Sequence, residues 1–372
     1  MPTIRDVAKL AGVSVATVSR VLNNSSKVSE QARAAVLKAQ RELDFHLNAN
    51  ARTLARKDSE IIGVTVSDMS DPYFGCMVRA CENAAHKIGC SLLVCQGFHE
   101  AEREIVAIEN LLSHHCRGMI VHALTISDEK LSAYMRRVPS MVLINRAIKG
   151  FADRCVNIDN EKGEYLAVSQ LIAAGHRAIA YVGSRHNIDD AKQRLSGFRK
   201  AMVEHNLPIH QRLMVADEPS LEGGIRAARE LFSRQVPFTA VAVYNDTMAA
   251  GLMSVFQEKG IAIPQDVSVV GFDDIMLARC LNPPLSTITN PVDEMGEAAV
   301  RLSSSLYHKD HQAAAIPDFE VRFVQRRSIS QPNPIPWTER FKSKSSHKGA
   351  QDKESKVLAA FRRAKEEAAH GH

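Results

Sequence analysis

AGVSVATVSR, residues 11–20, is the stretch on which the fold predicted for the start of the chain depends. Before it, Thr3 precedes apolar residues spaced three and four apart, which predicts a short capped helix that Gly12 ends by tolerating a left-handed backbone. After the turn, Ser14 is placed to cap a second helix, which turns Val18 inward and leaves another side exposed. The stretch therefore predicts two helices joined by a tight turn.

A third helix completes this small unit. Ser29 is placed to cap it, and apolar residues recur at helical spacing over residues 30–43. Three short helices about a glycine turn form a helix-turn-helix unit. Residues 1–60 also hold ten Lys and Arg against six Asp and Glu, and residues 326–372 hold eleven against five. Basic charge beside a helix-turn-helix favours a polyanion as partner.

Length and composition limit what the rest of the chain can be. The 372 residues are enough for two or three domains, and 45% hydrophobic with 24% charged residues is ordinary for a globular protein. The sequence has neither a run of about 18 apolar residues nor the apolar core of a signal peptide, so we expect a cytoplasmic protein without membrane contact. The seven cysteines lack Cys-x-x-Cys spacing, and we interpret them as reduced thiols in the core.

From residue 61 onward, short apolar strands alternate with amphipathic helices. The first series predicts strands near 61–67, 91–96, 118–122, 141–144 and 155–158, with helices near 74–89, 101–115 and 128–137. The second predicts strands near 178–183, 212–216, 239–244 and 267–272, with helices near 161–175, 189–206, 221–235 and 245–259. Such repeated units form parallel sheets covered on both faces, so we expect two α/β lobes. A ligand would bind in the cleft between them, beyond the carboxyl ends of the strands.

Several motifs resemble the lactose/galactose repressor family. They are TIRDVA at residues 3–8, GVS at 12–14, TVSRVLN at 17–23 and NANAR at 48–52. VA at 15–16, VLINR at 142–146 and YNDTMAAG at 244–251 are similar to the galactose branch of that family. The resemblance covers residues 2–328 and implies a multi-domain fold: an all-α helix-turn-helix head with a hinge helix, then a two-lobed α/β body with parallel sheets, of the type I periplasmic-binding-protein kind.

The resemblance also divides the chain. Residues 1–57 would be the DNA-binding head and hinge, and residues 58–330 the effector-binding and dimerisation body. Residues 331–372 lie beyond the resemblance, and their composition predicts a basic, disordered tail. Lobe 1 would hold about 58–160 and 291–318, and lobe 2 about 161–290 and 319–330, because the chain of such proteins crosses between lobes near 160, 290 and 320. Trp337, in the Pro-rich part of the tail, is expected outside any core.

Arg20 is the side chain that we expect to read a base, because a guanidinium in the major groove can bind guanine O6 and N7 together. Val15 and Ala16 cannot donate hydrogen bonds, so they would either contact thymine methyl groups or leave space. Neighbouring polar side chains would hold phosphates: Ser14, Thr17, Ser19, Asn23, Lys27 and Ser29. Helix capping explains Ser14 and Ser29 equally well.

Residues 48–56 predict a helix that is too short to be stable alone in water. By resemblance, this hinge helix contacts DNA through Asn48 and Ala51 and pairs with its twofold mate in the minor groove, where Leu54 wedges between base pairs. A homodimer on palindromic operator DNA follows, and a sugar would release it by favouring a form in which the hinge helices cannot pair. The alternative is a linker helix resting on the body. Further association of dimers in DNA looping is left open.

Polar residues after the predicted strands indicate a sugar site. By resemblance, the effector would be contacted by Asn145, Arg194, Asn245 and Asp273, with Tyr73, Phe74 and Phe272 as apolar walls. Carboxylates, amides and a guanidinium offer the paired donors and acceptors that vicinal hydroxyls need. D-galactose is the effector we expect, with a β-glucoside, ribose or a purine as alternatives. Helix capping by Asn245 and a structural ion pair of Asp273 are the other readings, and Pro219 stands where several relatives place an aromatic.

Other patterns do not indicate catalysis. The chain has no Gly-x-Gly-x-x-Gly, Walker or Gly-x-Ser-x-Gly motif. His114, His115 and Cys116 are adjacent and would point in different directions, so we expect no metal. Carboxylates such as Asp246, Asp273 and Asp274 occur in binding clefts without chemistry. We therefore expect neither enzymatic activity nor a cofactor. A sugar receptor that does not bind DNA remains the alternative, although it leaves residues 1–57 without a use.

Overall fold

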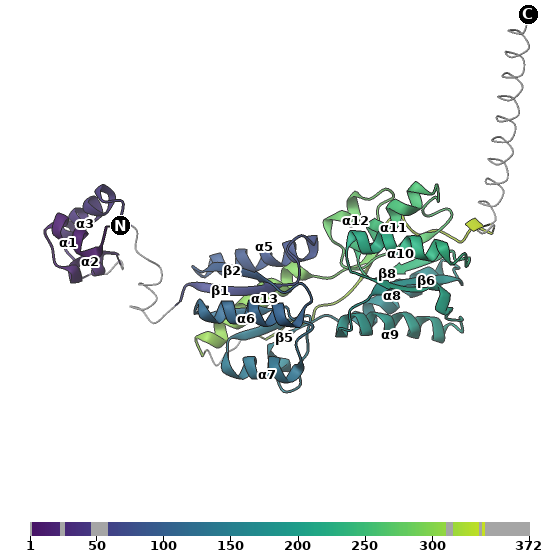
Figure 1. Ribbon diagram of the computed structural model, residues 1–372, viewed down its shortest axis with the longest axis horizontal. Coiled ribbons are helices and arrows are strands. Elements are labelled where there is room, and N and C mark those ends of the chain that lie inside the picture. The colour runs from purple at the N-terminus through teal and green to yellow at the C-terminus, as the bar shows by residue number, and fades with distance from the viewer. Residues whose placement is uncertain (1, 23–26, 46–58, 310–314, 335–336, 339–372) are drawn as a thin grey trace, which may run out of the picture. The chain divides into compact units, whose positions relative to one another are not determined.

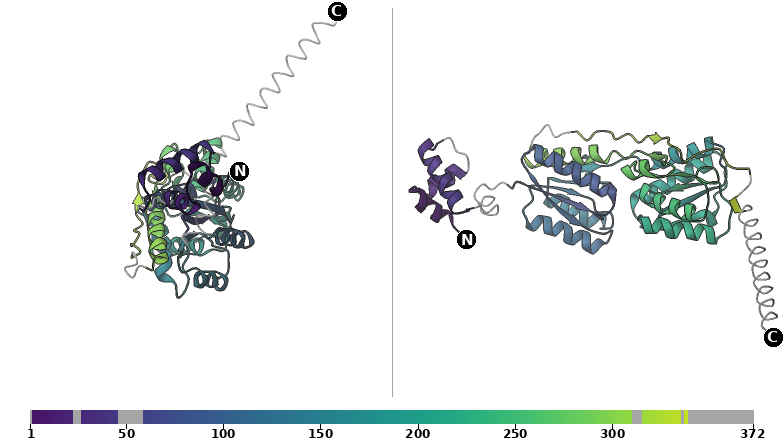
Figure 2. Two further views of the ribbon diagram at one scale, coloured as in Figure 1. Left: turned by 90° about the vertical axis from the view of Figure 1, so that its left-hand side faces the viewer. Right: turned by 90° about the horizontal axis from the view of Figure 1, so that it is seen from above.

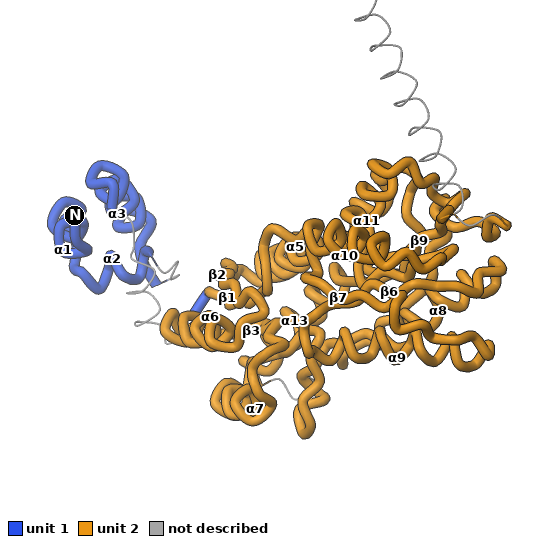
Figure 3. Tube along the Cα trace, turned by 45° about the vertical axis from the view of Figure 1, so that its right-hand side comes forward, with its two compact units in different colours: residues 1–60 blue, residues 61–372 orange. Residues whose placement is uncertain are grey.

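The computed structural model describes residues 2–22, 27–45, 59–309, 315–334, 337 and 338. The chain forms two compact units, divided between Glu60 and Ile61 (Figure 1, Figure 3). Within the described residues, no helix combines the length and apolar character needed to cross a membrane.

The first unit is a three-helix domain made of α1 (Ile4–Ala11), α2 (Val15–Leu22) and α3 (Glu30–Glu42). Thr3 caps α1 in a reciprocal pair: its side chain accepts from the Asp6 amide, and the Asp6 carboxylate accepts from the Thr3 amide at 2.7 Å. Gly12 ends α1 with φ at 66°, in the left-handed region. Valines from all three helices form the core, so the predicted helix-turn-helix unit is confirmed.

Lobe 1 of the second unit is a five-stranded parallel sheet in the order β2-β1-β3-β4-β5. Its strands are β1 (Ile61–Val66), β2 (Ser91–Gln96), β3 (Gly118–Val121), β4 (Met141–Ile144) and β5 (Cys155–Val156). The helices with it are α5 (Pro72–Lys87), α6 (Ala101–Ser113), α7 (Asp128–Arg137) and α13 (Val292–Tyr307), with a 3-10 turn at Ala152–Arg154. α13 packs on α5 although the two are more than 200 positions apart in the chain.

Lobe 2 is a four-stranded parallel sheet in the order β7-β6-β8-β9. Its strands are β6 (Ile179–Ser184), β7 (Met214–Asp217), β8 (Ala240–Val243) and β9 (Ser268–Val270). Its helices are α8 (Asn160–Ala173), α9 (Asp189–Glu204), α10 (Leu221–Ser233), α11 (Asp246–Glu258) and α12 (Met276–Cys280), with a 3-10 turn at Gln211–Leu213. The α8–α9 and α10–α11 pairs cover opposite faces of the sheet, because alternate strand residues enter different core clusters (Figure 1).

Three segments join the lobes (Figure 2). The first follows β5 and leads into α8, the second leads from lobe 2 into α13, and the third returns after α13. The second and third pair side by side as β10 (Thr287–Ile288) and β11 (Phe323–Val324), which are antiparallel. Ile158 in the first segment bridges Phe319 in the third. This short antiparallel pair is an addition to the parallel sheets that the strand pattern predicted.

Trp337 corrects one prediction, since it is buried in the lobe 2 core and is only 7% exposed. Its indole Nε1 donates to the Phe238 carbonyl at 3.0 Å, and its ring packs edge-on against Phe232 and Phe238. Cys280 corrects another, because this thiol is exposed rather than in the core, while all seven cysteines are free. Residues 339–372, which include most of the predicted tail, lie outside the described residues.

Candidate functional site

The outer side of α2 carries the side chains predicted to read DNA. Val15 is 42% exposed, and Ala16 and Arg20, one helical turn apart, are exposed as well. The inner side of the same helix buries Val18 and Val21. A single amphipathic helix therefore places a guanidinium beside small apolar groups on its exposed side.

Polar residues flank this helix face. Ser14 accepts from the Thr17 amide at 3.1 Å, and Ser29 accepts from the Ala32 amide at 3.3 Å, so both hydroxyls cap helices. Thr17 and Ser19 are half-buried, and Lys27 is exposed. The remaining predicted contacts lie outside the described residues: Asn23, Asn48, Ala51 and Leu54.

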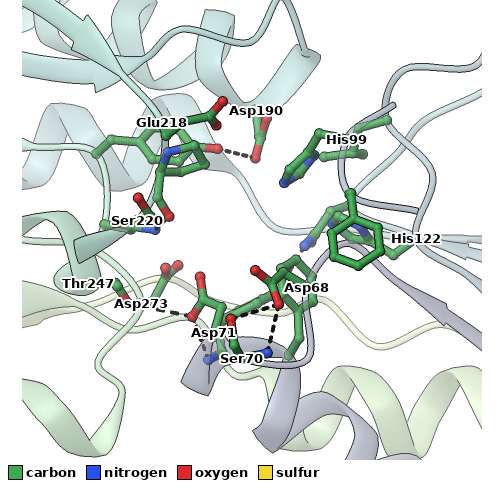
Figure 4. A pocket seen from close by; sticks show the side chains of 18 of the residues that line it. Asp68, Ser70, Asp71, His99, His122, Asp190, Glu218, Ser220, Thr247 and Asp273 are labelled. Atoms are coloured by element: carbon green, nitrogen blue, oxygen red, sulfur yellow. Dashed lines mark hydrogen bonds between the residues drawn. The ribbon is translucent and has the colours of Figure 1, made fainter. Parts of the chain in front are cut away.

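A cavity of about 530 Å³ lies between the two lobes, at the carboxyl ends of both sheets (Figure 4). Lobe 1 lines it with residues that follow β1, β2, β3 and β4: Asp68, Ser70, Asp71, Tyr73, Phe74, Phe98, His99, Glu100, His122, Leu124 and Asn145. Lobe 2 lines it with Asp190, Arg194, Glu218, Pro219, Ser220, Leu221, Glu222, Tyr244, Asn245, Thr247 and Asp273. Because strand ends meet at one edge of each parallel sheet, residues far apart in the sequence meet in the cleft.

Arg194 is the cation of the cavity and is only 4% exposed. Its Nε donates to the Asn160 side-chain oxygen at 3.0 Å, and its Nη1 donates to the Tyr244 carbonyl. Its Nη2 lies 3.4 Å from Asp273 Oδ1. The guanidinium carbon is 3.7 Å from the centre of the Phe272 ring. These contacts hold the guanidinium in one orientation.

Asn245 and Asp273 have structural partners and also line the cavity. Asn245 caps α11, since its Oδ1 accepts from the Met248 amide at 2.8 Å. Asp273, with φ at 107°, accepts from Asn290 Nδ2 at 3.0 Å in addition to its contact with Arg194. Burial raises the pKa of Asp273, and Arg194 opposes that rise. Asn245 therefore does cap a helix and Asp273 does form an ion pair, and both residues still line the cleft.

Lobe 1 contributes Tyr73, Phe74 and Asn145 to the cavity, and these are its residues that were predicted to contact the effector. Asn145 Nδ2 donates to the Tyr73 hydroxyl at 2.9 Å, whereas its Oδ1 is buried without a hydrogen-bond partner among the described residues. Tyr73 and Phe74 pack edge to face, with ring centres 5.2 Å apart. Phe272, also predicted as a wall, is fully buried beneath Arg194 and is not among the lining residues.

Several carboxylates line the cavity. Asp71 caps α5 through the Tyr73 amide at 2.9 Å and accepts from the Thr247 hydroxyl of lobe 2 at 3.5 Å. Burial raises the pKa of Asp71 to about 6, and the neighbouring Asp273 and Asp68 add to that rise. A cleft rich in carboxylates with one guanidinium favours a neutral ligand that donates many hydrogen bonds over an anion.

Sequence reasoning missed His99, His122 and Asp190, which line the cavity. His122 directly follows β3 and His99 lies three residues after β2, so the strand-end rule applied to them as well. Asp190 instead lies in the first turn of α9, and its carboxylate accepts from the Tyr244 hydroxyl at 2.7 Å. Among the described residues, no group of His, Cys, Asp and Glu is arranged to hold a metal ion.

Two family models match the chain. Residues 3–48 match that of the bacterial regulatory proteins of the lacI family, and residues 168–329 match a periplasmic binding protein-like domain. The HTH-type transcriptional regulator GalR of Salmonella typhimurium is 45% identical over 332 residues, which are 89% of this chain and 97% of that protein. GalR of Escherichia coli is 44% identical over 333 residues, 90% of this chain and 97% of that protein.

A solved structure agrees with these matches. The crystal structure of the lac repressor dimer bound to operator and the anti-inducer ONPF has a TM-score of 0.77 and 29% identity, over 88% of this chain and 99% of that one. The chain belongs to the LacI family of bacterial transcriptional regulators. Like its relatives, it is a DNA-binding transcriptional regulator and not an enzyme, and most of its body matches a periplasmic binding protein-like domain.

Proposed function

We propose that this protein is a homodimeric repressor of genes for galactose use, which binds palindromic operator DNA and leaves it when D-galactose enters the cleft. The observation that carries the proposal is the pairing, in one chain, of the exposed Arg20 face with a cavity built around Arg194 and acidic oxygens. The 44–45% identity to proteins named GalR supports galactose over another sugar. The protein works on DNA in the bacterial cytoplasm and needs no cofactor.

DNA reading is assigned to residues 1–57. Arg20 binds a guanine through two hydrogen bonds, and Val15 and Ala16 fit against thymine methyl groups. Polar groups on either side, from Ser14 to Ser29, hold phosphates and fix the register. One head covers one half-site, so a twofold dimer is required to bind a palindrome. The roles of Asn48, Ala51 and Leu54 in a hinge remain predictions from the sequence.

Effector binding is assigned to the cavity-lining side chains within the body, residues 58–330. Arg194 and Asp273 form a donor and acceptor pair for vicinal hydroxyls, and Asn145 and Asn245 add further polar groups. Tyr73 and Phe74 offer the apolar surface against which a pyranose ring packs. Sugar binding releases DNA by linkage, because it favours a form of the dimer whose affinity for the operator is lower.

A gel-shift experiment with a palindromic galactose-type operator, with and without D-galactose, tests the proposal. We expect the full chain to shift the operator, galactose to reverse the shift, and deletion of residues 1–57 to abolish it. Undiminished binding by the deletion variant would contradict the assignment of DNA reading. Calorimetry with galactose, a β-glucoside, ribose and a purine separates the alternative effectors, and tighter binding of another ligand would replace galactose.

Arg20→Ala tests the reading residue. We expect operator affinity to fall by about 1–3 kcal/mol, while binding to unrelated DNA, which depends on phosphates, changes little. Galactose affinity measured without DNA should be unaltered in this variant. Equal losses on operator and unrelated DNA would mean that Arg20 holds a phosphate and reads no base.

A further inference from the structure

Two histidines of lobe 1 share one hydroxyl at the edge of the cavity. Ser67 Oγ lies 3.3 Å from His99 Nδ1 and 3.1 Å from His122 Nδ1. Ser67 is buried, at 1% exposed, and follows β1 directly, while the rings come from the ends of β2 and β3. Figure 4 shows both rings side by side at the border of the cavity.

The surroundings of both rings favour their uncharged form. Burial lowers the pKa of His99 to about 4, and the nearby His186 contributes to the fall. Burial lowers the pKa of His122 to about 3, with a further contribution from His99. A neutral imidazole carries one N–H donor and one acceptor nitrogen, so each ring must adopt one of two tautomers.

The shared hydroxyl couples these tautomers. A serine hydroxyl has a single proton, and the described residues offer Ser67 Oγ no side-chain acceptor besides the two Nδ1 atoms. Leaving a buried hydroxyl proton unpaired is costly, so Ser67 donates to one Nδ1 and accepts from the N–H of the other. The first ring then carries its proton on Nε2, and the second has a bare Nε2.

Both Nε2 atoms remain available for a ligand. The hydrogen bonds of the described residues include none to Nε2 of either ring, and both residues line the cavity. We propose that Ser67 holds His99 and His122 in opposite tautomers, so that they present one donor and one acceptor to the effector and determine which hydroxyl pattern it must carry. This assignment rests on the proposed function and names residues that decide sugar specificity within it.

Lobe 2 holds the position of one of these rings. His99 stacks on His186, with ring centres 4.7 Å apart and an angle of 30° between the planes. His186 Nε2 lies 2.6 Å from Glu218 Oε2, and Glu218 also pairs with Arg185. On the other side, Phe74 packs edge-on against His122, at 4.8 Å between centres. These contacts restrict rotation of both imidazole rings. A ring therefore cannot turn to form a hydrogen bond with a hydroxyl that lies in a different position.

Calorimetry on the full chain with D-galactose and its 2-, 3-, 4- and 6-deoxy analogues tests the specificity role. In the wild type, we expect one deoxy analogue to bind about tenfold more weakly than galactose, because the hydroxyl that it lacks leaves an Nε2 atom unpaired. In His122→Phe or His99→Phe that analogue and galactose should bind equally. Equal ratios for every analogue in wild type and both variants would overturn the specificity role. Ser140→Ala, which removes another buried hydroxyl of lobe 1, is the control and should keep the wild-type ratios.

Nuclear magnetic resonance of the full chain with ¹⁵N-labelled histidine tests the tautomers without any sugar. We expect one of the two rings to be protonated on Nδ1 and the other on Nε2 at neutral pH, with His99→Phe and His122→Phe assigning the signals. Ser67→Ala should abolish the fixed pair and leave the rings exchanging. Identical tautomers in the wild type would overturn the proposal. Failure of the wild type to bind galactose would instead refute the effector assignment, and the spectra would still decide the tautomers.

Discussion

The two walls of the cleft differ in how fully their polar groups are paired. On the lobe 2 side, Arg194 uses all three of its guanidinium nitrogens within the protein, and Asn245 is committed to a helix cap. On the lobe 1 side, Asn145 Oδ1 lacks a partner among the described residues, and His99 Nε2 and His122 Nε2 have none either. The polar groups of lobe 2 are therefore fixed by the protein itself, and we call this wall the anchor, whereas in the proposed site a ligand would supply the missing partners of lobe 1.

Replacing Arg194 in the lobe 2 anchor should have the largest effect on ligand binding. Arg194→Ala leaves Asp273 buried without its cation, so we expect galactose binding to fall by more than about a hundredfold and lobe 2 to lose about 3–5 kcal/mol of stability. Operator binding should persist and no longer respond to galactose. Arg199→Ala, an exposed site on the same helix, is the control in calorimetry and gel shifts. A normal response of the Arg194 variant to galactose would mean that the site lies elsewhere.

Replacing Trp337 tests how much this residue stabilises the core of lobe 2. Trp337→Ala removes a buried aromatic, and we expect about 3–5 kcal/mol lower free energy of unfolding in urea, followed by circular dichroism. Trp337→Phe keeps a ring and loses the bond to the Phe238 carbonyl, so about 1 kcal/mol is expected. An unchanged midpoint in the alanine variant would show that this segment does not support lobe 2.

Asn145→Gly examines the lobe 1 wall with less effect on folding. The residue has φ at 59°, which glycine adopts without strain, and its side chain keeps one hydrogen bond, to Tyr73. We expect a change in stability below about 1 kcal/mol and about tenfold weaker galactose binding in calorimetry. Asn245→Ala is the lobe 2 counterpart, which should lose about 1 kcal/mol of stability with its cap. Similar stability losses in both would remove the distinction between the walls.

Asp71→Asn should have the smallest effect, and it depends on pH. The raised pKa of Asp71, about 6, means that the folded protein binds its proton more tightly than the unfolded chain does. Stability therefore decreases as the pH rises from the unfolded pKa through about 6, and the decrease should be smaller in the variant. An ionised carboxylate accepts sugar hydroxyls better, so galactose affinity should rise a few-fold between about pH 5 and 7.

The side-chain oxygen of Asn can replace the carboxylate oxygen that caps α5, so this variant removes the charge and keeps the helix cap. Calorimetry at several pH values should give a flat profile for the variant over that range. A variant that retains the wild-type profile would attribute the pH dependence to another group of the cleft.

Several site residues could be predicted because they follow strands in the sequence. Asn145, Asn245 and Asp273 come directly or closely after β4, β8 and β9, and all three line the cavity. Phe272 satisfied the same rule and yet lies beneath Arg194, because its ring is buried in the core against α8. Position after a strand identifies candidates, while the side that each residue faces depends on packing.

Trp337 is a residue whose burial the sequence did not predict. Its neighbours are prolines and polar residues, so no periodic pattern marks it as part of a core. It is buried because the chain after β11 passes along lobe 2, where Ser328 and Ser330 bond to β9. A single aromatic without a periodic apolar pattern around it has no local signal for burial, and only the path of the chain decides it.

Local patterns in the sequence were sufficient for the long helices and for the strands of the two parallel sheets of this protein. Capping residues, glycine turns and apolar periodicity act over three or four positions, so Thr3, Gly12 and Ser29 mark helix ends without any tertiary context. Tertiary structure alone decided which side chains share a partner: Ser67, His99 and His122 lie up to 55 positions apart, and Arg194 and Asp273 lie 79 apart. Their contacts depend on strand order and on the three passages between the lobes, which no local pattern specifies.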